Sequence, residues 1–225
     1  MSKFTIRILP VLILFLVAGA GQASAQGVSA YFGLGSAYDS AATSAGCPSG
    51  QIGDPFSSAS PAPCIPVSNM SGVFGVFGAD FMILPHLGFN GEYTFHFTQA
   101  SYLNSSNSLG VPINVRPNFY DFNAVYQPTS GDKRVVPVLE GGIGGAKLSF
   151  YGTSGAGTAF SSSQYFLSSN HFQVHGGVGV KFYVKSDIFI KPQFDIHYVP
   201  HLTDQYGRNA VPEFTIAIGY SFGRL

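Results

Sequence analysis

The sequence predicts an all-β protein, an eight-stranded antiparallel β-barrel that spans a membrane. Three observations support this prediction. Apolar and polar residues alternate with a period of two in one segment after another. The connections between these segments are short and long in turn. The composition combines 28 glycines, 21 phenylalanines and 12 tyrosines with only 10% charged residues, which favours strands and turns over helices.

Residues 1–25 have the pattern of a secretory signal peptide. Lys3 and Arg7 precede an apolar run, residues 8–18, and Ala25 ends a group of small residues suited to cleavage. The run is far shorter than the ~20 residues that a helix needs to cross a bilayer. We therefore expect an exported protein, cleaved after Ala25, with one β-barrel domain at 26–225.

The last alternating segment is the clearest. Phe214, Ile216 and Ile218 point to one side, while Glu213 and Thr215 point to the other. The same pattern recurs along the chain. We expect strands near residues 27–38, 72–83, 89–98, 118–127, 135–150, 171–184, 188–199 and 213–222.

The loops between these strands fall into two classes. The long ones are 39–71, 99–117, 151–170 and 200–212, and the short ones are 84–88, 128–134 and 185–187. In an antiparallel sheet the long loops then share one end. This is the layout of an outer-membrane barrel with short periplasmic turns and four long extracellular loops. A secreted sandwich or a lipocalin-like barrel is the alternative, since periodicity alone does not say which face is inside.

Two positions interrupt the pattern. On a regular fifth strand, Glu140 and Lys147 would point to opposite faces. Either a bulge at Gly141–Gly145 shifts the register, or Lys147 points outward above the lipid. Pro192 lies within the seventh strand and lacks an N–H for the ladder. We expect a local bulge or a bound water there.

The chain resembles the small eight-stranded outer-membrane barrels of Gram-negative bacteria, the OmpA-type and OmpX-type domains. The resemblance covers residues 27–225. It rests on the segments Gly78-Ala79-Asp80-Phe81, Gly91-Glu92-Tyr93-Thr94-Phe95, residues 122–128 and Gly219-Tyr220-Ser221-Phe222. It implies insertion among outer-membrane lipid and lipopolysaccharide, with the C-terminal strand 213–222 read by the barrel-assembly machinery. Family members end on an aromatic residue, whereas Gly223-Arg224-Leu225 follow Phe222 here.

The inward positions predict an ionic cluster in the lumen. If the turns centre near residues 86 and 186, Asp80 faces Glu92 and Lys181 faces Lys191. Like charges directly opposite each other are destabilising. An eight-stranded lumen is only wide enough for side chains to fill it, so these pairs meet across it. The alternative is that strand stagger separates them and each charge meets water.

A second polar layer is expected further from the short turns. The same turn, centred near residue 186, pairs His175 with His197. The full layer comprises His96, Asp121, Glu140, His175, Asp195 and His197. Histidines beside carboxylates can bind a metal or titrate, but no ligand motif is present, and a polar lumen that satisfies itself is the expected state. We expect no metal and no cofactor.

The loops and the charge balance limit the partners. Cys47 and Cys64 are an even pair in the exported part, which predicts a disulfide in the first long loop. Eleven basic against eleven acidic residues leave no surplus of positive charge for nucleic acid. We expect a monomer, with a possible surface ligand bound through the loops.

Enzyme motifs are incomplete. His197 is followed two residues later by Val199 rather than by a serine nucleophile, and Ser168 and His171 have no visible orienting acid. The sequence therefore predicts a non-enzymatic structural or surface-interaction protein, for adhesion or envelope integrity, with a lumen plugged by polar and ionic side chains. A narrow cation-preferring channel is the alternative, since six inward acids face two lysines. A lipid A-modifying enzyme is a more remote one.

Overall fold

The computed structural model describes residues 27–69, 71–129, 133–154, 162–204 and 207–223. The expected signal peptide, residues 1–25, and the last two residues of the chain lie outside this range. None of the described segments forms a helix long and apolar enough to cross a bilayer.

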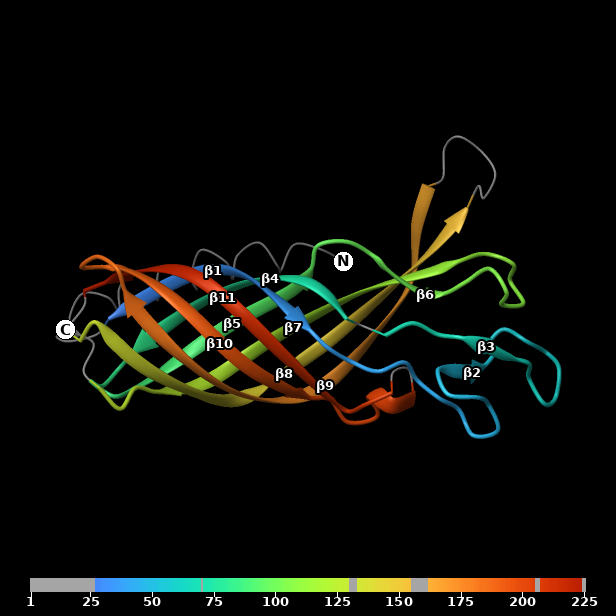
Figure 1. Ribbon diagram of the computed structural model, residues 1–225, viewed down its shortest axis with the longest axis horizontal. Helices are drawn as coiled ribbons and strands as arrows, with labels where there is room; N and C mark the ends of the chain where they lie inside the picture. Colours follow the sequence, from blue (N-terminus) through green and yellow to red (C-terminus); the bar gives the residue numbers. More distant parts are fainter. Residues whose placement is uncertain (1–26, 70, 130–132, 155–161, 205–206, 224–225) are drawn as a thin grey trace, which may run out of the picture.

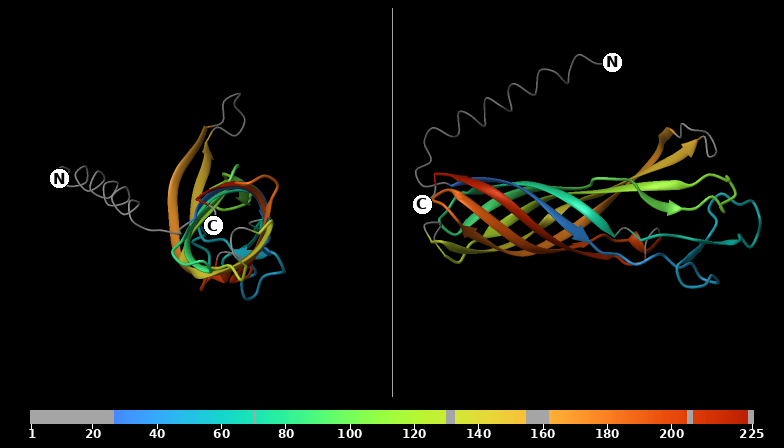
Figure 2. Two further views of the ribbon diagram at one scale, coloured as in Figure 1. Left: turned by 90° about the vertical axis from the view of Figure 1, so that its left-hand side faces the viewer. Right: turned by 45° about the horizontal axis from the view of Figure 1, so that its top comes forward.

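Eight antiparallel strands close into a barrel, as the sequence predicts (Figure 1). Each strand pairs with the next along the chain, and the first pairs with the last. The end-on view in Figure 2 shows the closed ring. The barrel strands are β1 (Val28–Ala37), β4 (Gly72–Met82), β5 (Leu87–His96), β7 (Ile113–Tyr126), β8 (Val135–Ser154), β9 (Ser162–Tyr183), β10 (Ile188–Tyr198) and β11 (Ala210–Phe222).

The long loops carry short elements of their own. Strands β2 (Gln51–Gly53) and β3 (Cys64–Pro66) form a small hairpin, β6 (Ala100–Leu103) pairs with the start of β7, and the 3-10 helix η1 (Leu202–Asp204) follows β10. The Cys47–Cys64 disulfide forms within the first long loop, which confirms that prediction. All of these elements lie at one end of the barrel (Figure 1).

Several strands are longer than their apolar alternation suggests. β7 begins at Ile113 instead of 118, β8 runs to Ser154, and β9 starts at Ser162 instead of 171. The extensions of β8 and β9 leave the barrel rim as a projecting hairpin (Figures 1 and 2). The extension of β9 carries polar residues such as Ser168, Ser169 and Asn170 next to the apolar Leu167, so no regular apolar alternation marks it in the sequence.

Both interruptions are resolved without a shift of register. The pairing of β7 with β8 is continuous across Gly141–Gly145, so no bulge forms there and Lys147 points outward. The pairing of β9 with β10 omits Lys191 and Pro192 but has the same register on both sides. The bulge expected at Pro192 is therefore absent, and the ladder is interrupted instead.

The first hairpin register differs from the expected one. Asp80 pairs with Asn90, and Glu92 pairs with Gly78. The backbone N–H groups of Ile83 and Leu84 both donate to the carbonyl of Leu87, which closes the turn one residue earlier than assumed. Because side chains alternate, a shift of the turn centre by one residue moves each partner by two positions and keeps it on the same face. The prediction that Asp80 faces Glu92 was therefore wrong.

The outer wall of the barrel is apolar and the inner wall is polar. Large hydrophobic side chains on the strands are exposed, including Phe122 at 72% and Ile218 at 61%. Ion-forming side chains such as Lys181, Asp80 and Asp195 are at most 1% exposed. This is the inverse of a soluble barrel, in which the apolar face fills the centre.

Candidate functional site in the barrel lumen

The lumen near the short turns holds an ion pair between β4 and β9. Lys181 Nζ lies 2.6 Å from Asp80 Oδ2 and donates to Ser29 Oγ at 3.2 Å. Asn90 Nδ2 donates to the other oxygen of Asp80 at 2.7 Å. Lys181 also lies 5.0 Å from the centre of the Phe189 ring. Each charged atom of this pair is thus compensated inside the barrel, as a buried charge requires.

A second ion pair joins β10 to β8. Lys191 Nζ lies 2.6 Å from Glu140 Oε1, and 4.2 Å from the ring centre of Tyr31. The sequence pattern predicted Glu140 in the layer above, and Lys191 in a cluster with Asp80, Glu92 and Lys181. In the structure Glu140 belongs to the ionic cluster. Gly177 of β9, which pairs with Glu140 on one side and Asp195 on the other, has no side chain between them.

Tyr31 connects the two ion pairs. Its hydroxyl donates to Glu92 Oε2 at 2.6 Å and accepts from Asn90 Nδ2 at 2.7 Å. Asn90 also contacts Asp80, so hydrogen bonds run from Lys181 through Asp80, Asn90 and Tyr31 to Glu92. Glu92 thus has a phenol rather than a lysine as its direct hydrogen-bond partner.

Tyr31 was not among the predicted site residues, although the alternation of the sequence shows that it points inward. Ser29, Tyr31 and Gly33 alternate against Val28, Phe32 and Leu34, which places Tyr31 inward. A matching signal lies on the next strand, where Gly78 pairs with Tyr31. A Cβ atom at Gly78 would overlap the phenol ring, so glycine is needed for this close approach.

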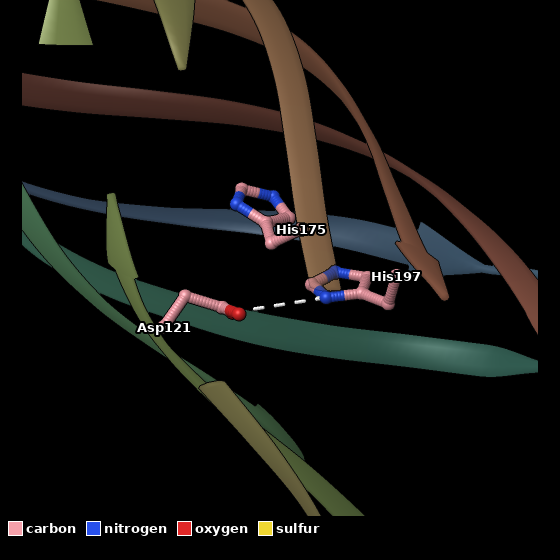
Figure 3. A group of neighbouring side chains, drawn as sticks. All are labelled: Asp121, His175 and His197. Carbon is pink, nitrogen blue, oxygen red and sulfur yellow. Dashed lines mark ion pairs between the residues drawn. The ribbon is translucent and has the colours of Figure 1, made fainter. Parts of the chain in front are cut away.

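His175 and His197 form the next layer, stacked on each other as Figure 3 shows. Their ring centres lie 4.8 Å apart, and the two residues pair across β9 and β10 as expected. His175 Nε2 lies 3.1 Å from Asp195 Oδ1, and Nδ1 lies 2.9 Å from Asn123 Oδ1. Both nitrogens of His175 thus face oxygen atoms of the barrel wall.

His197 lies between two carboxylates and two rings. Its Nε2 lies 3.2 Å from Glu213 Oε2, and its Nδ1 lies 3.7 Å from Asp121 Oδ2 (Figure 3). Phe119 stacks on its other face with 4.6 Å between ring centres. The predicted layer is therefore present around Asp121, His175, Asp195 and His197, with Glu213 in addition.

His96 does not join this layer. Its ring packs edge-on against Phe74, with ring centres 4.8 Å apart, and its Nδ1 faces the carbonyl of Thr98. The earlier turn in the first hairpin shifts all of β5 relative to β4, so His96 lies opposite Phe74. It therefore borders the apolar part of the lumen.

The histidine layer does not have the geometry of a zinc site. Candidate ligand atoms of Asp121, His175 and His197 lie within 4.8 Å of one another. A zinc ion bound at ~2 Å needs imidazole nitrogens whose lone pairs converge in the ring planes. The two rings are stacked with only 26° between their planes, so their nitrogens do not aim at a common point.

Acids outnumber lysines in the lumen. Asp80, Glu92, Asp121, Glu140, Asp195 and Glu213 face Lys181 and Lys191, and all eight side chains are buried. In the described part of the chain, several carboxylate oxygens have no hydrogen-bond partner, among them Glu140 Oε2, Asp195 Oδ2 and Glu213 Oε1. The two lysines therefore do not balance the acidic side chains of the lumen.

A cluster of buried apolar side chains, the apolar plug, lies above the histidines. Phe119 and Phe74 begin it, with 6.2 Å between their ring centres. It continues into the long loops and includes buried Val115, Leu148, Val211, Leu103, Ile52, Ile65 and Leu202. Loop and barrel residues thus share one hydrophobic core. The sequence did not predict it, because several of its members, such as Ile52, Ile65 and Leu202, come from loops whose mutual packing has no periodic signal.

Comparison with solved structures confirms the architecture. The chain is similar to a major outer membrane protein from Thermus thermophilus, at 12% identity and a TM-score of 0.57, covering 88% of this chain and 100% of that one. It is also similar to the outer membrane protein OprG from Pseudomonas aeruginosa, at 12% identity and a TM-score of 0.51, covering 88% and 96%. The chain has the fold of the small outer-membrane β-barrels. No protein-family model and no curated protein matches the sequence.

Within this fold, the lumen determines whether a small outer-membrane barrel conducts. An eight-stranded barrel leaves room for its own side chains and little else. Here the described inward residues form an ionic layer, a histidine layer and an apolar plug in succession. The arrangement can stabilise the wall and block the lumen.

Proposed function

We propose that the protein is an integral outer-membrane barrel, exported through a signal peptide at residues 1–25, whose lumen is sealed and whose function lies in its extracellular loops. The role is non-enzymatic, in surface interaction such as adhesion or in envelope integrity. The single observation that carries the proposal is the apolar plug, which joins the loops to the barrel above a buried ionic network.

The outer wall supports the membrane location. Exposed Phe, Ile, Val, Leu and Tyr side chains cover the strands, and the inward alternation is polar, which is the pattern of barrels that lipid surrounds. The described chain starts and ends at the short-turn end, where Val28 pairs with Phe222. In the proposed orientation this end is periplasmic, and the projecting β8–β9 hairpin is extracellular.

The loops present a preformed surface. Asp54 Oδ2 in the first loop accepts from the backbone N–H of Ser108 at 2.6 Å and also from its hydroxyl. Asp54 Oδ1 accepts from the N–H of Phe56 at 2.9 Å. Phe56 and Leu109 next to these contacts are exposed, at 38% and 52%. An ordered surface binds with a smaller entropy cost than a loop that must fold on binding.

Further contacts connect the long loops elsewhere. Val67 in the first loop forms a bridge with Leu103 in the second, and the N–H of Ser68 donates to the carbonyl of Tyr102 at 3.0 Å. The N–H of Gly207 in the last loop donates to the carbonyl of Ser40 at 2.7 Å. Three of the four loops are therefore cross-connected through their backbones.

Display on a bacterium that lacks other adhesins tests the proposal. Cells carrying the protein are expected to adhere to cultured epithelial cells, or to resist detergent better than cells without it. The double variant Phe56→Ser/Leu109→Ser is expected to lose the adhesion while its barrel stays folded. The control Leu84→Ser removes an exposed leucine from the opposite end and should change neither property. No gain in adhesion or detergent resistance over empty cells would overturn the proposal.

A cation channel is the second candidate, and the acid excess in the lumen is the observation that favours it. Current would have to pass the apolar plug around Phe74 and Phe119, which is fully buried. An enzyme is disfavoured because His197 lies beneath the same plug, where a substrate does not reach it. Single-channel recording in a planar bilayer decides between the sealed and the conducting state.

A further inference from the structure

Charges on the outer wall of the barrel are confined to one place. The described barrel strands contain ten charged side chains, of which eight are buried in the lumen. The remaining two are Arg116 on β7 and Lys147 on β8, and both point outward. Two cations on an otherwise apolar wall are costly in a membrane unless they meet an anionic partner.

The two cations are neighbours at the upper limit of the apolar belt. Arg116 pairs with Ser149, and Asn118 pairs with Lys147, so the cations are diagonal neighbours on adjacent strands. Towards the short turns the next outward side chain on β7 is Tyr120, followed by exposed Phe122. Towards the loops the outward positions become polar, as at Asn114. In the orientation proposed above, this height corresponds to the headgroups of the outer leaflet.

A pocket of about 320 Å³ opens beside Arg116. It forms where β5 and β7 separate, because their pairing ends at Phe95 and Asn118. The pocket is lined by Tyr93, Phe95, His96, Phe97, Arg116 and Asn118. It therefore combines a cation and an amide with an aromatic wall.

Two polar side chains of this pocket, Arg116 and Asn118, each have an atom without a hydrogen-bond partner among the described residues. Arg116 Nη2 donates to the carbonyl of Phe97 at 2.7 Å, which holds the guanidinium at the pocket wall. Arg116 Nε and Asn118 Oδ1 are buried, and neither has a hydrogen-bond partner among the described residues. On the two outward-facing polar residues of the pocket, one donor and one acceptor are thus left for a ligand, since buried polar groups are normally satisfied.

The aromatic wall continues downward into the belt. Tyr93 and Phe95 stack with ring centres 5.7 Å apart, and Phe95 meets Phe97 edge-on at 5.1 Å. Such rings sit at the membrane interface in outer-membrane barrels. They offer a flat apolar surface for an acyl chain whose headgroup lies at Arg116.

We propose that Arg116, Asn118 and Lys147 bind the phosphate-bearing headgroup of an outer-leaflet lipid. Arg116 and Lys147 contact the phosphate, Asn118 accepts from a headgroup hydroxyl or amide, and Tyr93 and Phe97 support an acyl chain. Guanidinium and ammonium groups are the usual protein partners of phosphate. A lipid is favoured over a free anion because the pocket lies on the lateral wall and continues into the apolar belt.

Native mass spectrometry of the refolded mature barrel in detergent tests this site. The probes are bisphosphorylated lipid A, the same lipid without phosphates, and inorganic phosphate. We expect retention of one phosphorylated lipid, with affinity lowered roughly tenfold or more in Arg116→Gln/Lys147→Gln and by added salt. The control Lys185→Gln removes an exposed cation at the short-turn end and should leave the affinity unchanged.

Three results would overturn the site. These are equal retention of the phosphate-free lipid, unchanged affinity in the double variant, and competition by inorganic phosphate at the same concentration as the lipid. Gel mobility with and without boiling checks that each variant folds. Should Arg116→Gln fail to fold, Lys147→Gln alone changes only an exposed side chain, and it must still weaken binding severalfold.

Discussion

Lys191 on β10 and Glu140 on β8 form a 2.6 Å ion pair that passes across β9, where Gly177 and Gly179 have no side chains. The pair is buried, so each charge depends on the other for compensation. The lumen is therefore built by complementary volumes and charges on strands that are not adjacent in the ladder.

Removing one member of this pair should be costly. Lys191→Met leaves Glu140 buried without its cation, and we expect a loss of about 3–5 kcal/mol in the free energy of unfolding. Glu140→Gln should also destabilise, and the double variant should lose less than the sum of the two. Urea unfolding of the barrel in lipid vesicles measures all three, with Lys185→Met at an exposed turn as control. Strict additivity would show that the two residues are not coupled.

Lys181 offers a parallel experiment at the lower ion pair. Lys181→Ala leaves Asp80 with Asn90 alone and should lower the melting temperature in micelles. A melting temperature equal to that of the wild type would contradict the ionic role assigned to the lumen.

Tyr31 should matter through its hydroxyl. Tyr31→Phe keeps the ring but removes the donor to Glu92 and the acceptor for Asn90, which should cost about 1–3 kcal/mol. Tyr93→Phe removes a hydroxyl from the outward face and serves as the matched control. Equal stability of the two variants would show that the hydroxyl contacts of Tyr31 are dispensable.

Gly78 should tolerate no side chain. Gly78→Ala puts a methyl group where the Tyr31 ring lies, and overpacking of this kind typically costs about 1–3 kcal/mol. Gly91→Ala is the control, because a Cβ there meets no atom within 4 Å. Thermal unfolding followed by gel mobility compares the two, and an equal effect would remove the argument for volume complementarity.

Asp39 should make the stability of the barrel depend on pH. It follows β1 at the long-loop end, and burial raises its pKa from 3.8 to about 6. The folded state then binds the proton more tightly than the unfolded state does. Stability should therefore fall by up to about 3 kcal/mol as pH rises from about 4 to about 6 and stay level above it.

Asp39→Asn isolates this contribution. The asparagine has a similar shape and no charge, so the variant should be more stable than the wild type above pH 6 and similar to it at pH 4. The quantity to measure is the difference in unfolding free energy between the two proteins across this range. A difference that does not change with pH would contradict the assignment.

Much of the barrel could be predicted from period-two alternation. Each acid and lysine assigned inward lies inward, because parity alone fixes the face of a residue on a strand. The pairing of β9 with β10 was also predicted, as the pair His175 and His197 shows. The predicted pairing of β4 with β5 was wrong because the turn at Leu84–Leu87 closes one residue early. The alternation of apolar and polar residues does not reveal the geometry of a short turn.

Contacts across the lumen could not be predicted in the same way. Which charge meets which depends on the shear of the barrel, and this decided that Lys191 pairs with Glu140 while Glu92 bonds to Tyr31. The apolar plug was also invisible, since Leu202 and Ile65 come from separate loops. Parity gives the face of a residue, while shear and loop packing give its height and its neighbours.

Single-channel recording of the refolded mature barrel in a planar bilayer tests the central claim most directly. The sealed lumen predicts a folded barrel that shows no current steps, because the layer around Phe119 and the ion pairs beneath it leave no open path. Steady cation-selective steps from a barrel proven folded by gel mobility would contradict that claim and establish the channel instead.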